Sequence, residues 1–151
     1  MSAATAPGDP TYPSPVVSLR SALAGEHAAV YAYGIVGARV SPAQRPAVRA
    51  VYDAHRVRRD SLEARIRELG QQPVPAEPAY TLPFDVVDAA AARRLAALVE
   101  ERLAALYADV VYSARDRGLR DLGASALAEA AVRAAQWSGV TVAFPGLPER
   151  G

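Results

Sequence analysis

The hydrophobic positions of the chain recur with helical spacing in four separate stretches. From residue 15 or 18 to about residue 39, and again from residue 41 to 70, apolar side chains return every three or four positions. The same spacing appears from residue 85 or 88 to about 117, and from about residue 120 to 138. Such a period places the apolar side chains on one face of an α-helix. The pattern therefore predicts four amphipathic helices.

Capping residues give the expected ends of these helices. Ser41 precedes a proline, which is typical of a helix start, and Gly70 is a natural helix stop. Asp85 and Asp88 are alternative caps for the third helix. We expect a tight turn at Gly118 to connect the third and fourth helices.

The second and third helices are separated by a crossover, residues 71–87, in which the helical pattern is lost. Four prolines favour an extended, polyproline-like run there, at positions 73, 75, 78 and 83. At about 3.1 Å per residue the crossover can span roughly 50 Å, whereas the second helix is only about 40 Å long at 1.5 Å per residue. The connection can therefore travel the length of a bundle, which makes the second and third helices parallel. An up-down-up-down bundle would need only a few residues at this point.

Composition supports an all-α fold and removes several kinds of chemistry. The chain has 151 residues, 51% of them hydrophobic and only 7% aromatic, with alanine and leucine prominent. There is no cysteine, so disulfides and thiolate sites are excluded. All 17 basic residues are arginine, so a lysine Schiff base is excluded as well.

The charge pattern and the ends of the chain suggest a cytoplasmic protein. The net charge of +1 offers no attraction to nucleic acid, and no apolar stretch approaches the roughly 20 residues of a membrane span. Residues 1–15 are small, polar and proline-bearing, unlike a secretory signal, and we expect a disordered leader. Residues 16–151 are expected to form the bundle, with the C-terminal tail docked on it.

Polar side chains interrupt the apolar faces at the middle of each helix. Glu26 and His55 lie within the seams of the first and second helices. Glu129 shares a face of the fourth helix with apolar residues, Val132 among them, which we expect to point inward. Glu100 flanks the seam of the third helix, with Glu101 as the alternative if the phase is displaced by one residue. Four helices thus each offer one potential ligand or charged group to the core.

The two helix pairs also resemble each other in sequence. The first helix carries Glu26 and, seven residues later, Tyr33, and the third carries Glu100 and, seven residues later, Tyr107. A bundle built from two similar hairpins joined by the crossover would show this repeat.

Three segments carry a likeness to known proteins: Glu-His-Ala-Ala-Val-Tyr-Ala-Tyr-Gly at 26–34, His-Arg-Val-Arg-Arg-Asp at 55–60, and Ala-Phe-Pro-Gly-Leu-Pro at 143–148. They resemble a family of ferritin-like proteins of high-GC actinobacteria that has no settled activity. The helices, crossover and inward polar residues together resemble the wider ferritin-like superfamily. The likeness runs from about residue 16 to the end of the chain, and it implies a ferritin-like four-helix bundle.

The resemblance also implies where a dinuclear metal centre would lie. The superfamily uses one Glu from each of two helices and a Glu-x-x-His from each of the other two. Glu26 and Glu100 match the single glutamates, His55 matches the first histidine, and Glu129 matches the second motif's glutamate. Positions 52 and 132 hold tyrosine and valine in place of the remaining glutamate and histidine. Two of the six ligands are thus absent, and the implied metal site is degenerate.

Two functions remain open at this stage. In the first, the protein is a non-catalytic binding or structural module without a cofactor, and Arg59 and Arg133 balance the carboxylates in its core. In the second, it is an oxidoreductase or metal-binding protein that holds a single Fe, Mn or Zn ion on one ligand from each helix. Three tyrosines are expected around the four candidate ligands in either case: Tyr33, Tyr52 and Tyr107. A homodimer is the expected assembly.

Overall fold

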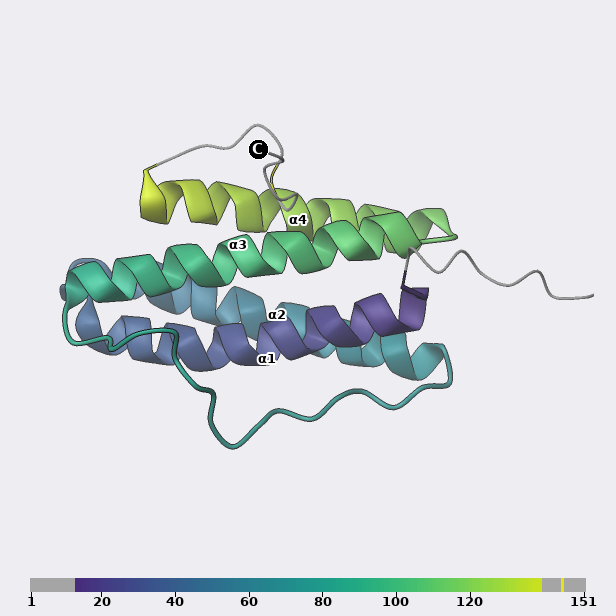
Figure 1. Cartoon of the computed structure of the whole chain (residues 1–151), viewed down its shortest axis with the longest axis horizontal. Coiled ribbons are helices and arrows are strands. Elements are labelled where there is room, and N and C mark those ends of the chain that lie inside the picture. Colours follow the sequence, from purple (N-terminus) through teal and green to yellow (C-terminus); the bar gives the residue numbers. More distant parts are fainter. Residues whose placement is uncertain (1–12, 140–144, 146–151) are drawn as a thin grey trace, which may run out of the picture.

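The described part of the chain is entirely helical apart from its connections. In the computed structural model, residues 13–139 and residue 145 are described, and they contain no strand (Figure 1). The helices are α1 (Pro15–Arg39), α2 (Arg45–Glu68), α3 (Ala89–Ser113) and α4 (Arg117–Ser138). The all-α, four-helix prediction is therefore confirmed. Residues 1–12 of the predicted leader, and the docked tail apart from residue 145, lie outside the described residues.

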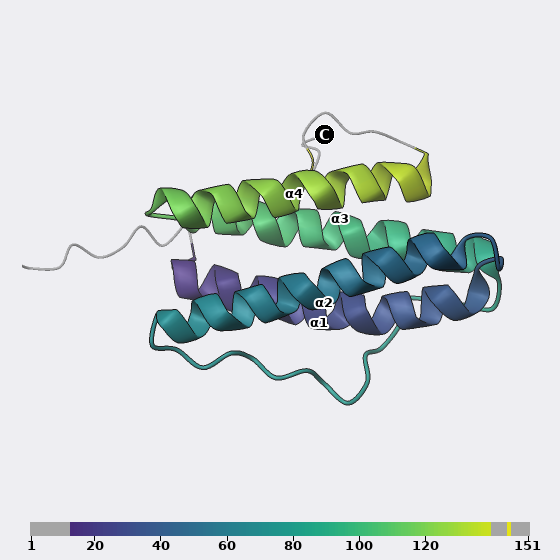
Figure 2. The same cartoon turned by 180° about the vertical axis from the view of Figure 1, so that it is seen from behind.

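The four helices form a bundle in which α2 and α3 are parallel. Figures 1 and 2 show α1 and α2 running in opposite directions, α3 running with α2, and α4 returning beside α3. Helix α1 packs against both α2 and α3, and α3 packs against α4. No Cα atom of α2 lies within 8 Å of a Cα atom of α4, so the α2–α4 edge of the bundle is wide.

The crossover runs beside α1 and in the same direction, which confirms that it spans the bundle (Figures 1 and 2). Near its start, the Nε2 atom of His27 and the carbonyl oxygen of Val74 are 3.0 Å apart in a hydrogen bond. Near its end, Arg39 Nε donates to the carbonyl oxygen of Val86 at 3.0 Å. His27 is only 7% exposed, because the crossover lies against it.

Two predicted boundaries are confirmed by their caps. The Asp88 side chain accepts a hydrogen bond from the backbone N–H of Ala91 at 2.8 Å, as an N-cap residue does. Gly70 has a φ of +73°, which an L side chain disfavours, so its place after α2 suits glycine.

Two other predicted boundaries are wrong. The Ser41 hydroxyl donates to the Gln44 side chain at 3.3 Å, and α2 begins only at Arg45. The turn between α3 and α4 precedes Gly118, because Asp116 accepts from the backbone N–H of Leu119 at 2.8 Å and caps α4. An aspartate cap satisfies a free helical N–H, which glycine cannot do, so α4 starts three residues earlier than expected.

The predicted face of α4 is displaced by about one residue. We expected Glu129 and Val132 on the inward face, but Val132 is 57% exposed and the inward positions include Ala130 and Ala134. Alanine occurs on several sides of this helix, both buried and exposed, so the apolar pattern does not identify its buried face.

The apolar core falls into two clusters along the bundle. One lies where α1 begins and α2 ends and includes Leu19, Leu23, Leu62 and Ile66. The other lies where α1 ends and α2 begins and includes Tyr33, Val36, Val48 and Leu95. The polar centres of the helices fall between these two clusters.

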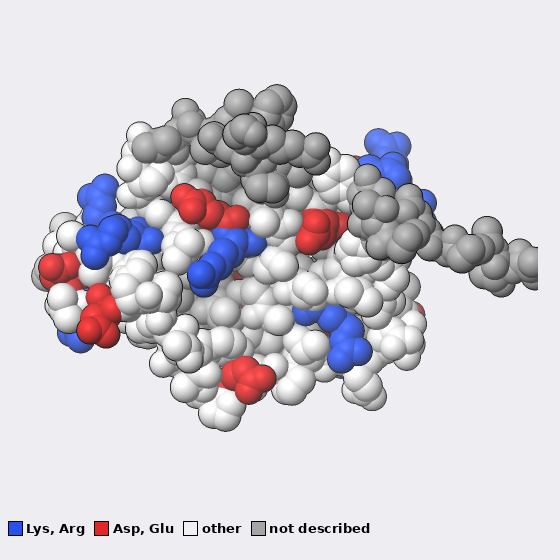
Figure 3. Space-filling model, viewed as in Figure 1, with Lys and Arg blue, Asp and Glu red and all other residues white. Residues whose placement is uncertain are grey.

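None of the four described helices is long and apolar enough to cross a membrane. On the face seen in Figure 3, blue and red side chains are scattered between uncharged areas.

Candidate functional site

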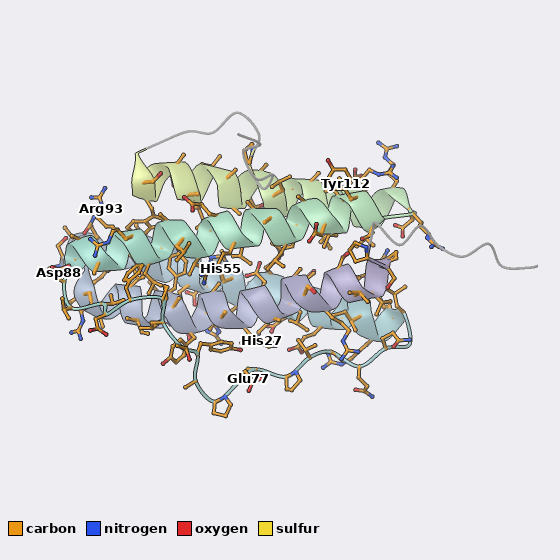
Figure 4. The ribbon with its side chains drawn as sticks, viewed as in Figure 1. His27, His55, Glu77, Asp88, Arg93 and Tyr112 are labelled. Carbon is orange, nitrogen blue, oxygen red and sulfur yellow. The ribbon has the colours of Figure 1, made fainter. Side chains whose placement is uncertain are left out.

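Three ionisable side chains meet in the middle of the bundle and form what we call the buried cluster: Glu26 of α1, His55 of α2 and Glu100 of α3. Their exposed fractions are 1%, 2% and 0%. His55 lies inside the bundle (Figure 4), with Nδ1 2.7 Å from Glu26 Oε2 and Nε2 3.1 Å from Glu100 Oε1. Each ring nitrogen therefore makes a hydrogen bond to a different carboxylate, and the imidazole links the two glutamates.

Two tyrosines complete the carboxylate contacts in a reciprocal way. The Tyr33 hydroxyl of α1 donates to Glu100 Oε1 of α3 at 2.5 Å. The Tyr107 hydroxyl of α3 donates to Glu26 Oε1 of α1. Because α1 and α3 are antiparallel, the Glu-to-Tyr spacing of seven residues brings each glutamate level with the tyrosine of the other helix. The sequence repeat thus has a structural counterpart.

Helix α4 reaches this network through Trp137. Its indole N–H donates to the Tyr33 hydroxyl oxygen at 3.0 Å. Sequence reasoning missed this role, because a tryptophan near a helix end is most simply read as core. The only available signal was its separation from Glu129 by about two helical turns.

The electrostatics of the cluster favour a charged imidazole. Burial alone would lower the His55 pKa, but hydrogen bonds to Glu100 and Glu26 and the charges of both carboxylates raise it to about 9. At neutral pH His55 is therefore an imidazolium whose two N–H groups donate to the glutamates. Burial, with the neighbouring carboxylates, also raises the pKa values of Tyr33 and Tyr107 well above 10, so both hydroxyls keep their protons.

A small cavity adjoins the cluster on the side of α2 and α4. Its volume is about 10 Å³, which is about the space of one water molecule. Glu26, His55 and Glu100 line it together with Tyr107. Glu100 Oε2 is buried and has no hydrogen-bond partner among the described residues.

The same cavity is bounded on its outer side by what we call the arginine–glutamate bridge: Arg58 of α2 with Glu129 and Arg133 of α4. Arg58 Nη2 donates to Glu129 Oε2 at 2.9 Å, and Arg133 Nη2 lies 3.8 Å from the same oxygen. The side chain of Glu129 is 46% exposed, and those of Arg58 and Arg133 are 23% and 20% exposed. This bridge links the two helices across the wide edge.

The structure thus brings Glu26, His55 and Glu100 into direct contact. Glu129 lies apart from them and pairs with Arg58 and Arg133. Arg133 lines the cavity, whereas Arg59 pairs with Asp60 at 2.7 Å. Arg58, one residue earlier, takes the place we predicted for Arg59. Its position is set by the helical phase, which a run of arginines conceals.

Three further sequence assignments are also clarified. Glu100 faces the core, and Glu101 is exposed. Tyr33 and Tyr107 contact the glutamates directly, whereas the ring of Tyr52 lies 5.8 Å from the guanidinium carbons of both Arg49 and Arg56. Tyr52 is partly buried against the second apolar cluster, and its ring faces these two arginines.

The described residues contain no group of three or more His, Asp or Glu side chains arranged to hold a metal ion. The hydrogen bonds explain why. Protonated on both nitrogens, His55 has no free lone pair, and each glutamate has at least one oxygen occupied by a tyrosine hydroxyl. The residues in this arrangement do not fit a metal centre.

Comparison with known proteins places the chain among proteins of the same fold. A family model described as "Domain of unknown function (DUF4439)" matches residues 18–149. The crystal structure of a conserved hypothetical protein from Mycobacterium tuberculosis, Rv2844, is 36% identical, covers 83% of this chain and 95% of its own, and has a TM-score of 0.81. No match was found among curated proteins.

Proposed function

Since the chain belongs to the DUF4439 family, whose description assigns no activity, we propose its function from the chemistry of the buried cluster. We infer that it is a ferritin-like, non-catalytic binding or structural module, in which a charge-balanced hydrogen-bond network takes the place of a dinuclear metal centre.

The observation that carries this proposal is the double engagement of His55. A histidine that ligates a metal offers one nitrogen lone pair to the ion. In this protein the two nitrogens are 2.7 Å and 3.1 Å from carboxylate oxygens on two other helices. The imidazolium itself therefore serves as the cation that holds the two glutamates together.

Charge balance supports the same function. The buried cluster carries a formal charge of −1 when His55 is protonated, and the arginine–glutamate bridge carries +1. The six groups line one cavity, so their charges cancel locally without a metal ion. Removing one member would leave its partner buried and unpaired, which explains how such a network can be kept without catalysing a reaction.

A metal-binding oxidoreductase is the competing function, and elemental analysis distinguishes the two. The protein is purified without chelator, incubated with Fe²⁺, Mn²⁺ or Zn²⁺, desalted, and assayed for bound metal. We expect only substoichiometric metal in the wild-type protein. His55→Ala tests the cluster, and His27→Ala is the matched control because the chain has two histidines and His27 bonds to the crossover.

One outcome would overturn the proposal. It is a metal ion bound at one per chain in the wild type and in His27→Ala, and lost in His55→Ala. The expected homodimer stays a prediction, which a measured mass in solution tests separately.

A further inference from the structure

Helices α2 and α4 are linked by long side chains, whereas the backbones of the other neighbouring helices approach each other closely. No Cα atoms of these two helices approach within 8 Å, and the bridge of Arg58, Glu129 and Arg133 spans the gap over the cavity. Glu129, the common partner of both arginines, is 46% exposed, and exposed ion pairs contribute little stability, about 0–1 kcal/mol. An outward turn of Glu129 is therefore the change that would open the cavity to solutes.

The donors at the outer side of this cavity are only partly used. Arg58 and Arg133 converge on one oxygen, Glu129 Oε2. The separation of 3.8 Å to Arg133 is beyond hydrogen-bond reach, so among the described residues this guanidinium attracts Glu129 without a hydrogen bond to it. Both guanidinium groups face one oxygen of Glu129, so the site suits a carboxylate that can use both of its oxygens, one for each arginine.

The inner side of the cavity has an acceptor that lacks a donor, whereas the outer side has unused donors. Glu100 is fully buried, and its Oε2 accepts no hydrogen bond in the described part of the chain. An unfilled buried acceptor costs about 1–3 kcal/mol, so it favours any molecule that brings a donor. The pseudo-symmetric oxygen, Glu26 Oε2, receives its donor from His55 on α2. Of the α4 residues that line the cavity, Ala126 and Ala130 carry no donor, and Arg133 does not hydrogen-bond to Glu100 Oε2.

These two needs define the ligand. We propose that the cavity binds a small carboxylate carrying a hydroxyl or ammonium group on the adjacent carbon, that is, a small 2-hydroxy or 2-amino acid. The ligand's carboxylate replaces that of Glu129 between Arg58 and Arg133, and its donor reaches Glu100 Oε2. As it stands, the cavity of about 10 Å³ admits only a water molecule. The volume vacated by the Glu129 carboxylate supplies the remaining space, so Glu129 acts as an internal competitor.

The inference rests on the metal-free function proposed above, because a metal ion at the cluster would itself occupy Glu100. Titrations with glycolate, glycine and acetate at constant ionic strength test it, followed by NMR of the arginine Nε–Hε signals. The buffer is stripped of metal on a chelating resin, since soluble chelators carry carboxylates of their own. We expect glycolate or glycine to bind at least about fivefold more tightly than acetate, since acetate lacks the donor. Whichever of the two binds more tightly identifies the donor as hydroxyl or ammonium.

Variants separate the site from general charge effects. Glu129→Ala removes the competitor and is expected to tighten binding about two- to fivefold, the reciprocal of a weak ion pair. Arg133→Met is expected to weaken binding at least tenfold. Arg49→Met is the matched control, because Arg49 is an exposed arginine of α2 that pairs with Asp53 within its own helix.

Three results would overturn the inference. The first is the absence of arginine signal shifts at about 50 mM ligand, a concentration that suffices to detect millimolar binding. The others are equal affinities for acetate and the two substituted acids, or an equal loss of affinity in Arg133→Met and Arg49→Met. Stoichiometric metal in the elemental analysis would refute the metal-free function alone. The titration of the stripped protein still reads the carboxylate site, so the two failures are distinguishable.

Discussion

The pKa of His55 makes the stability of the fold depend on pH in a definite window. Burial lowers its pKa, but the hydrogen bonds to Glu100 and Glu26 together with the charges of both carboxylates raise it from 6.5 to about 9 in the folded protein. A rise of roughly 2.5 in pKa, at about 1.36 kcal/mol for each unit, corresponds to about 3 kcal/mol of stabilisation. The side chain is only 2% exposed, so solvent screening removes little of this amount.

The direction of the effect follows from proton binding. Because the folded state binds this proton more tightly than the unfolded state, the stabilisation is fully present below pH 6.5 and is lost as the pH rises to about 9. Above that pH the neutral imidazole has only one N–H, so one of the two glutamates faces a nitrogen lone pair. The tyrosines of the network keep their protons throughout this window, since the pKa values of Tyr33 and Tyr107 are raised above 10.

Urea unfolding at a series of pH values measures this prediction. Between about pH 6 and pH 9.5 we expect the free energy of unfolding to fall by about 3 kcal/mol, with an unchanged dependence on urea. His55→Gln should flatten the profile, and the imidazole ¹³C signal of His55 in the wild type gives its pKa directly should that variant not fold. A profile flat to within about 0.5 kcal/mol, or a measured His55 pKa below 7, would refute the reasoning.

Three other predictions concern packing and hydrogen bonds, and urea or thermal unfolding and proteolysis measure them. Gly123→Ala should destabilise the protein by about 1–3 kcal/mol, because the new Cβ would lie 3.0 Å from two valine side chains and 3.2 Å from the backbone of α3. Gly34→Ala should instead stabilise it by about 0.5–1 kcal/mol, because alanine favours the helix and the new Cβ would have no atom within 4 Å. Equal effects would contradict the packing. Tyr107→Phe should cost about 1.5–3 kcal/mol by leaving a Glu26 oxygen without its donor, and a neutral result would show that water replaces the hydroxyl. His27→Ala should make the crossover cleavable by protease before the helices unfold, and unchanged cleavage would show that the bond to the crossover carbonyl does not hold it.

Much of the fold is encoded in local patterns that the sequence displays openly. The prolines of the crossover and the Gly70 stop are local signals, and they were sufficient to predict parallel α2 and α3. Glu26 and His55 could be placed in the core because each interrupts an otherwise apolar seam.

The details of the site depend on helical phase, which the sequence expresses weakly. Neighbouring arginines at 58 and 59 are equally polar, so only the packed structure shows which of them reaches Glu129. Alanine covers several sides of α4, and this is why Val132 was placed inward although it is 57% exposed. The bond from Trp137 to Tyr33 joins residues 104 positions apart, and no local pattern encodes such a contact.

The reciprocal tyrosine–glutamate bonds bear on how such a protein could have arisen. One helix carrying a glutamate and, seven residues later, a tyrosine is self-complementary when it meets a second copy of itself in antiparallel orientation. A half-length hairpin of this kind could therefore have formed the centre of a symmetric dimer before any duplication joined two copies in one chain. Each glutamate still depends on the tyrosine of the opposite half, so neither half can lose its pair without unsettling the other.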